Sequence, residues 1–169
     1  MHSSLFNEEL SQKKLDELFM IEALKEAKRA FEENEVPVGC VIVHNKKIIA
    51  RGHNQTELLK DATAHAEMLC ITSANSYFND FRLEGTTLYS TLEPCGMCAS
   101  AMFLARVKRL VWAAKDVRLG ANGSFIDLFS LKHPMHKIEV TSNILQDDAS
   151  FLMKQFFKKV RYEKKRTTQ

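Results

Sequence analysis

Apolar side chains recur at intervals of three and four residues along the first long segment of the chain. This spacing places them on one face of an α-helix. The pattern therefore predicts an amphipathic helix from about Asp16 to Glu33, preceded by a polar extension at residues 1–14. The side chains expected on the apolar face are Met20, Leu24, Ala27 and Phe31.

Two runs rich in β-branched residues follow this helix. They are Val38–His44 and Lys47–Gly52, and the polar pair Asn45-Lys46 joins them, so we expect a β-hairpin. Beyond the hairpin, helix and strand patterns alternate with short connections. In order they predict a helix from near His65 to before Asn79, a strand at Thr86–Leu92, a helix at Gly96–Arg106, a strand at Val107–Ala114, a loop at Lys115–Ser124, a short helix at Phe125–Leu131, a strand at His136–Thr141 and a final helix from about Ile144 to Tyr162.

This alternation predicts an α/β sandwich with a largely parallel central part. No repeat and no linker rich in Gly, Ser or Pro divides the chain, so residues 1–169 are expected to form one domain. The inner face of the final helix is expected to contain Phe151, Leu152, Phe156 and Val160.

Composition is that of an ordinary soluble protein, with 45% apolar and 27% charged residues. No apolar stretch approaches the length of a membrane span, and the N-terminus lacks the pattern of a signal peptide. We therefore expect a cytoplasmic protein. In a reducing compartment, its four cysteines indicate metal binding or packing rather than disulfides. Cys40 and Cys70, next to apolar segments, are expected to be small buried hydrophobes.

Basic residues are concentrated at the C-terminal end, although the net charge is only +3. Two interpretations stay open. Such a tail attracts a phosphate backbone, but it is equally typical of a solvated helix end, where the helix dipole favours cations. The basic side chains of this tail are Lys154, Lys158, Lys159, Arg161, Lys164, Lys165 and Arg166.

The strongest chemical signal is a pair of motifs, His65-Ala66-Glu67 and Pro94-Cys95-Gly96-Met97-Cys98. One imidazole and two thiolates bind zinc, and three protein ligands are typical of a catalytic zinc site. Cys95 and Cys98 are three residues apart, so at the first turn of a helix both sulfurs face the same way. The helix N-terminus also favours the thiolate that a zinc ligand must be.

Glu67 and Asn54 are candidates for the remaining chemistry. Because Glu67 lies two residues after His65, both reach one ion only at a helix start, with His65 near the cap and Glu67 in the first turn. Its carboxylate could then carry protons from the zinc-bound water to the substrate. Asn54 follows the second strand and can donate and accept, so it could read the edge of a base. A turn-forming role is the alternative for Asn54.

These motifs resemble those of the bacterial tRNA adenosine deaminases, one family of zinc nucleobase deaminases. The resemblance covers about Leu18 to Arg161. It rests on the segments Glu35-Val36-Pro37-Val38-Gly39, Gly52-His53-Asn54, Asp61-Ala62-Thr63-Ala64-His65-Ala66-Glu67-Met68, Thr91-Leu92-Glu93-Pro94-Cys95-Gly96-Met97-Cys98 and Gly120-Ala121-Asn122-Gly123-Ser124.

The resemblance implies a three-layer α/β/α sandwich of the cytidine deaminase type with a five-stranded mixed sheet. It implies one zinc ion per subunit, with a water or hydroxide as fourth ligand, which attacks C6 of adenosine and releases ammonia. The implied substrate is the wobble position, 34, of a tRNA-Arg anticodon, held by a homodimer whose two subunits both contact the stem-loop. The site residues implied are the zinc ligands His65, Cys95 and Cys98, the proton shuttle Glu67, and the adenine contacts Asn54 and Val36.

Two other functions remain open. An enzyme of the same fold could act on a free base or nucleoside, such as guanine or cytosine, although the basic tail and Gly120–Ser124 favour tRNA. A non-catalytic, zinc-stabilised binding module would need a fourth protein ligand, for which His53 and Cys70 are the candidates.

Overall fold

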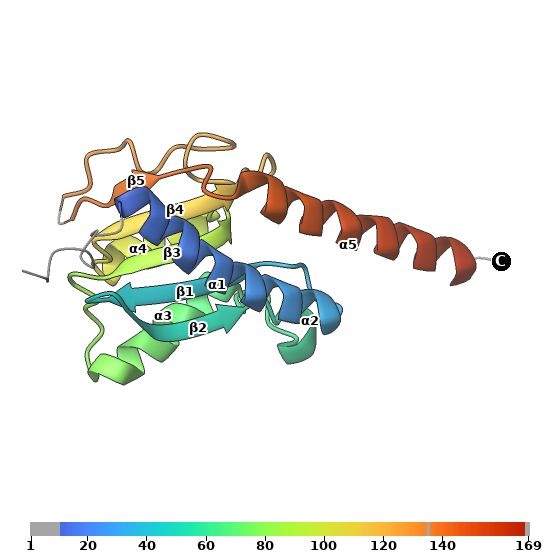
Figure 1. Ribbon diagram of the computed structural model, residues 1–169, viewed down its shortest axis with the longest axis horizontal. Coiled ribbons are helices and arrows are strands. Elements are labelled where there is room, and N and C mark those ends of the chain that lie inside the picture. Colours follow the sequence, from blue (N-terminus) through green and yellow to red (C-terminus); the bar gives the residue numbers. More distant parts are fainter. Residues whose placement is uncertain (1–10, 135, 168–169) are drawn as a thin grey trace, which may run out of the picture.

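Five helices and five strands follow one another in the part of the chain that the computed structural model describes, residues 11–134 and 136–167 (Figure 1). The predicted extension at residues 1–14 falls largely outside this part. In chain order the elements are α1 (Gln12–Glu32), β1 (Gly39–His44), β2 (Lys47–His53), α2 (Thr56–Leu59), α3 (Ala66–Phe78), β3 (Thr87–Leu92), α4 (Gly96–Leu104), β4 (Arg109–Ala114), β5 (Glu139–Thr141) and α5 (Gln146–Thr167).

The strands form a mixed five-stranded sheet in the order β2-β1-β3-β4-β5. β1 runs antiparallel to β2 and β3, whereas β3, β4 and β5 are parallel. The predicted hairpin is confirmed. Its two turn residues, Asn45 and Lys46, both have positive φ, 49° and 60°, as a tight turn that matches the strand twist requires.

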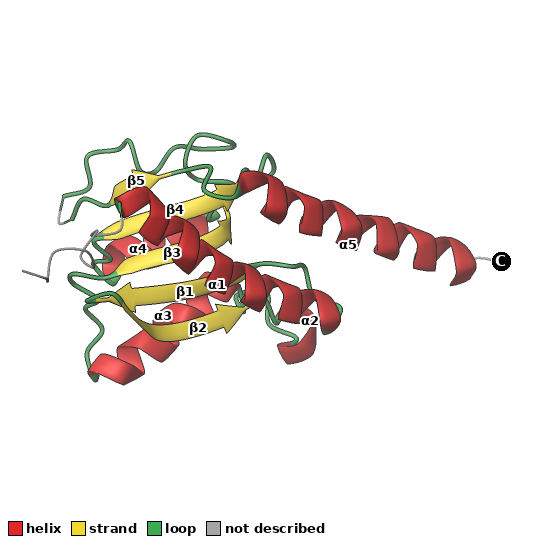
Figure 2. Ribbon diagram, in the orientation of Figure 1, coloured by secondary structure: helices red, strands yellow, loops and turns green. Residues whose placement is uncertain are grey.

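Helices cover both faces of the sheet, which confirms the predicted three layers (Figure 2). Side chains alternate along each strand, so Val41, Tyr89 and Val111 face the core under α1 and α5. Their neighbours Ile42, Leu88 and Leu110 face the core under α3 and α4. Cys40 and Cys70 are fully buried in this second core, as predicted.

α1 packs very closely against the start of β1. A Cβ atom on Gly39 would lie 2.1 Å from the carbonyl oxygen of Ala23 and 2.3 Å from the amide nitrogen of Ala27. Only a glycine permits this approach. On its other side the start of β1 lies beside the end of β3, where Cys40 pairs with Ser90 and the Gly39 amide donates to the Thr91 hydroxyl at 3.0 Å.

A buried ion pair ties the other end of α1 to the sheet. The Arg109 guanidinium donates to both carboxylate oxygens of Asp16 at 2.7 Å, and the Tyr89 hydroxyl donates to Asp16 at 2.9 Å. Burial by itself raises the pKa of the Asp16 carboxyl. The hydrogen bonds from Arg109, Gln12 and Tyr89 outweigh it, so the pKa lies below its usual value.

Two predictions about the second half of the chain are wrong. Phe125–Leu131 is not helical, because its amides bond to a preceding loop: Phe125 donates to the carbonyl of Gly120 and Leu128 to that of Ala121. Phe151 is 64% exposed and does not belong to the inner face of α5. In that helix Ala149 and Phe156 are buried, and Leu152 and Val160 are half-buried.

None of the helices within the described ranges is both long and apolar enough to cross a bilayer.

Candidate active site

The start of β1 and the ends of β2, β3 and β4 lie together at one end of the sheet. Each is joined there to a segment that contains candidate site residues. The pairings Gly39 with His53 and Cys40 with Ser90 bring the start of β1 next to the ends of β2 and β3. β4 ends beside β3, because Leu92 pairs with Ala114. Polar residues far apart in the sequence are therefore gathered at the carboxyl ends of the parallel strands, where open α/β sheets bind ligands.

The start of α3 positions the first motif. His65 is the N-cap of this helix, with extended backbone angles (φ −74°, ψ 152°), and Glu67 lies in the first turn. The change from extended to helical backbone between the two residues lets both side chains face the same cavity. The helix start expected from the spacing of His65 and Glu67 is confirmed.

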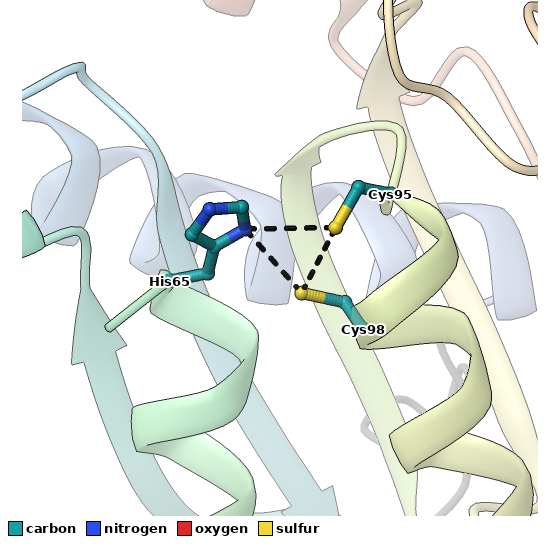
Figure 3. Close-up of side chains that lie close together, drawn as sticks. All are labelled: His65, Cys95 and Cys98. Atoms are coloured by element: carbon teal, nitrogen blue, oxygen red, sulfur yellow. Dashed lines mark hydrogen bonds between the residues drawn. The ribbon is translucent and has the colours of Figure 1, made fainter. Parts of the chain in front are cut away.

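The start of α4 positions the second motif in the same way. Cys95 is the N-cap and Cys98 lies in the first turn. The two sulfur atoms are 3.7 Å apart, and each lies 3.6 Å from Nδ1 of His65, so the three donor atoms form a nearly equilateral triangle (Figure 3).

This triangle has the dimensions of one face of a zinc tetrahedron. With zinc–sulfur bonds of about 2.3 Å and zinc–nitrogen bonds of about 2.0–2.1 Å, tetrahedral angles give edges of about 3.8 Å between sulfurs and about 3.6 Å between sulfur and nitrogen. In the described ranges, no other His, Cys, Asp or Glu joins the three donors. The donor set and its geometry therefore fit a zinc ion with three protein ligands, the number found in catalytic sites.

The two residues that a closed structural site would need are engaged elsewhere. The Nε2 atom of His53 lies 2.9 Å from the Glu33 carboxylate, and the Cys70 thiol donates to the carbonyl of Cys40 at 3.6 Å. Neither residue belongs to the triangle of donors, which argues against the zinc-stabilised binding module.

The protonation of the two thiols differs even without a metal. The hydrogen bond from Cys98, helped by His65 and opposed by burial, lowers the pKa of the Cys95 thiol to about 4. The hydrogen bond to Cys95 and burial raise the pKa of Cys98. The pair thus holds a thiolate next to His65, whose own pKa is raised chiefly by its hydrogen bond to Cys95. Negative charge at this position suits a metal cation.

Glu67 is 3% exposed and lies beside these ligands, in the cavity that His65 and Cys95 line. Burial raises the pKa of its carboxyl and outweighs the hydrogen bonds from its own backbone amide and from Cys98, which lower it. The Ser90 hydroxyl also donates to this carboxyl, at a long distance of 3.4 Å. A buried carboxyl with a raised pKa is suited to taking up and releasing a proton.

Asn54 reaches the cavity from the end of β2 and is held from behind by Glu35. Its side-chain amide donates to Glu35 Oε2 and to the Thr56 hydroxyl, both at 3.3 Å. Glu35 is 1% exposed and also accepts from the amide of Leu58 at 2.7 Å. The orientation of Asn54 is thus set by a buried carboxylate whose role was not predicted, although an acid directly before the apolar segment Val36–Val38 is a recognisable signal.

The cavity has a volume of about 170 Å³. That is below the ~300–1,000 Å³ typical of sites for drug-sized ligands, so it suits a group the size of one base. It includes all the predicted site residues except Cys98, which is fully buried beneath it. The lining residues are Val36, Val38, Asn54, Thr56, His65, Glu67, Leu92, Glu93, Cys95, Asp116, Arg118, Leu119 and Met153.

Comparison with known proteins is consistent with this geometry. Residues 13–114 match the cytidine and deoxycytidylate deaminase zinc-binding region. The tRNA-specific adenosine deaminase of Bacillus subtilis (strain 168) is 46% identical over 150 residues, which cover 89% of this chain and 93% of that protein. The chloroplastic tRNA(adenine(34)) deaminase of Arabidopsis thaliana is 48% identical over 165 residues, 88% of this chain but 13% of that longer protein.

Solved structures share the fold. A structure from a study of A-to-I editing by tRNA:A34 deaminases is 41% identical and superimposes with a TM-score of 0.77, covering 80% of this chain and 98% of that one. The guanine deaminase of Nitrosomonas europaea, at 19% identity and a TM-score of 0.68, covers 92% of this chain and 97% of its own. At that identity, the likeness concerns the fold alone.

Proposed function

This chain belongs to the tRNA-specific adenosine deaminases of the zinc-dependent cytidine and deoxycytidylate deaminase family, and we propose that it converts adenosine to inosine at position 34 of a tRNA-Arg anticodon. The observation that carries the proposal is the triangle of His65 Nδ1, Cys95 Sγ and Cys98 Sγ, with Glu67 in the same cavity. A three-ligand zinc site beside a buried carboxylate is the arrangement that hydrolytic deamination of a base requires.

The reaction is a hydrolysis: adenosine and water give inosine and ammonia. A zinc ion held by these three donors would lower the pKa of a water molecule and so supply the nucleophile. A carbon–oxygen bond forms at C6, and the bond from C6 to the amino nitrogen breaks.

Glu67 is proposed to transfer the protons in this reaction. In this proposal one carboxylate oxygen takes the proton of the attacking water and passes it to the ring nitrogen next to C6. The same carboxylate then takes the second proton from the hydroxyl now bonded to C6 and gives it to the amino group, which leaves as ammonia. The raised pKa of Glu67 fits a group that must both accept and donate a proton during the reaction.

Asn54 and Val36 are proposed to hold the base. The Glu35 carboxylate occupies one side of the Asn54 amide, so the remaining hydrogen-bonding capacity of Asn54 faces the cavity that it lines. Val36, Val38 and Leu92 offer apolar walls for the ring. A base reaches these groups only after leaving its stack, which costs least in a single-stranded anticodon loop.

α5 is proposed to hold the phosphate backbone next to the cavity. Met153, on this helix, lines the cavity, and the helix then extends away from the sheet (Figure 1). Residues 161–166, which include several of the basic residues, are all exposed. We further propose that the protein is a homodimer and that it acts in the cytoplasm, where tRNA is matured. Light scattering on the purified protein tests the dimer.

Two experiments test the function. The first is sequencing of cellular tRNA after depletion of the protein, with unmodified adenosine expected at position 34 of tRNA-Arg. The second is a deamination assay of the purified enzyme on a tRNA-Arg anticodon stem-loop, on the same stem-loop with guanosine at position 34, and on free guanine and cytosine. Turnover of a free base together with no activity on RNA would overturn the proposal in favour of a free-base deaminase.

A further inference from the structure

Glu93, which the proposed chemistry does not use, is 1% exposed and lies directly before Pro94 and Cys95. Its carboxylate accepts four hydrogen bonds from a single loop. Oε1 accepts from the amides of Asn122 (2.8 Å) and Ser124 (3.2 Å), and Oε2 accepts from the amide of Asp116 (3.2 Å) and from the Ser124 hydroxyl. A buried carboxylate satisfied almost entirely by backbone N–H groups fixes the path of that backbone.

The loop that Glu93 holds, residues 116–124, forms one side of the substrate cavity. Asp116, Arg118 and Leu119 all line the cavity. Arg118 is exposed, and its guanidinium lies over the ring of Phe157 on α5, 5.7 Å from the ring centroid, whereas Leu119 is 52% exposed. The backbone of the rim is held by its hydrogen bonds to Glu93 beneath the loop.

The loop also closes tightly over the carboxylate. A Cβ atom on Gly120 would lie 2.4 Å from Cδ of Glu93 and 2.5 Å from the carbonyl oxygen of Asp116. On the other side, Ala121 donates to the carbonyl of Pro94 at 2.8 Å, and Gly120 forms a bridge with Cys95. Glu93 and its loop thus form one packed unit next to a proposed zinc ligand.

We propose that Glu93 is a positioning residue for the substrate, which acts by holding the rim residues Asp116, Arg118 and Leu119 at the distance from the zinc ligands that a bound nucleotide requires. The inference rests on the proposed deaminase function. In this proposal Glu93 neither transfers a proton nor contacts the substrate.

The test is Glu93→Gln. The variant keeps the shape of the side chain but replaces one acceptor oxygen with an NH₂ group, so at least one buried N–H of the loop loses its partner. We expect KM for the anticodon stem-loop to rise about 10- to 100-fold, the scale at which small misplacements act, with kcat changed less and zinc content unchanged. Faster hydrogen exchange at the amides of Asp116, Asn122 and Ser124 reports the loop position without any substrate.

Glu84→Gln is the matched control, because Glu84 is 63% exposed and pairs with Arg106 on the surface. It should keep wild-type kinetics and wild-type exchange at residues 116–124. Wild-type KM and exchange in Glu93→Gln would overturn the inference. Loss of zinc with an unchanged KM in the zinc-loaded fraction would overturn it too, since Glu93 would then support Cys95 rather than the rim.

Ser124→Ala covers the case in which Glu93→Gln does not fold. It removes one of the four donors and leaves the carboxylate, so we expect a smaller rise in KM in the same direction, and wild-type kinetics would contradict the inference. If the wild type and Glu84→Gln are both inactive on the stem-loop, the proposed function is what fails. The exchange data then still decide whether Glu93 holds the loop.

Discussion

At the scale of single residues, the candidate site consists of two short motifs that the fold brings together from separate parts of the sequence. His65 and Glu67 share one helix start, and Cys95 and Cys98 share another, so local backbone geometry decides where each pair faces. What brings the pairs to within bonding distance of one ion is the packing of α3 and α4 side by side on one face of the sheet. Each residue can be tested by a change that leaves this scaffold intact.

Glu67→Gln should abolish most of the activity without loss of metal. The variant keeps all three donors but cannot accept a proton, so kcat is expected to fall by about 10²–10⁴-fold. Zinc content, measured by mass spectrometry of the metal, and the unfolding temperature should stay near wild type. A variant without zinc would show that Glu67 contributes to metal binding instead.

Cys98→Ala should release the metal, because it removes one of three ligands. The chain provides a matched control in Cys70→Ala. Cys70 is also fully buried, but its thiol donates to the carbonyl of Cys40 and does not belong to the proposed metal site. Stoichiometric zinc in Cys98→Ala, or equal zinc loss in the two variants, would contradict the assignment of ligands.

Prediction from the sequence succeeded where the signal was local. The spacing of two residues between His65 and Glu67, and of three between Cys95 and Cys98, predicts that each pair lies at the start of a helix. Glu35 and Glu93 also lie within the motifs, but the spacing of the motifs does not predict their roles, because their hydrogen-bond partners are 19 to 31 residues away. Asp116 and Met153 reach the cavity only through the packing of β4 and α5, which no spacing encodes.

At the scale of elements, the helices are attached to the sheet by different forces. α1 is held by close backbone packing at Gly39 and by a buried ion pair at Asp16. α5 is held by apolar contacts: Ala149 joins the core on the sheet, and the ring of Phe156 lies 6.0 Å from that of Phe31 on α1, edge to face. The two attachments predict different responses to substitution and to pH.

Asp16→Asn should destabilise the fold by about 3–5 kcal/mol, because it leaves Arg109 without its buried partner. Asp80→Asn, which breaks an ion pair with both side chains 44% exposed, should cost less than about 1 kcal/mol. Urea unfolding of both variants gives the comparison. Equal effects would show that the ion pair at Asp16 contributes no more than a surface pair.

The same pair gives stability a defined dependence on pH. The pKa of Asp16 is lower in the folded state than in the unfolded state, so the ionised carboxylate stabilises the fold above the unfolded pKa of about 3.9. This contribution is lost as the pH falls through the folded pKa. Wild type should therefore lose stability more steeply than Asp16→Asn below about pH 4, as urea unfolding at several pH values would measure. Parallel curves would rule out this contribution.

Phe156→Ala should destabilise the fold by about 3–5 kcal/mol, since it empties a buried aromatic site. Phe151→Ala should be nearly neutral, because its ring is 64% exposed. These outcomes also test the corrected face of α5. The two rings are five residues apart, which is about 140° around an α-helix. The face that buries Ala149 and Phe156 therefore turns Phe151 towards solvent.

At the scale of the whole molecule, basic charge is concentrated at the end of one helix. The basic residues near the C-terminus belong to α5, which extends away from the sheet, whereas the proposed zinc ligands lie at the starts of α3 and α4. Replacing Lys158, Arg161 and Lys165 with Gln should weaken binding of the stem-loop. It should also reduce the slope of log Kd against log salt by about 2, at about 0.7 per phosphate contact in a single strand.

The control for this triple variant replaces three exposed lysines from other parts of the surface, Lys13, Lys46 and Lys108. It lowers the net charge equally and should leave the salt slope almost unchanged. Filter binding over a range of salt concentrations distinguishes the two variants. Identical slopes would mean that the end of α5 is only a solvated helix.

Because Met153 and Lys165 belong to one continuous helix, about 18 Å separates the wall of the base site from the far cations. A helix keeps this distance fixed. If the far cations bind the RNA backbone, only the nucleotide about 18 Å along the RNA from that contact would reach the proposed metal site. The helix would then select one anticodon position among neighbours of the same chemistry.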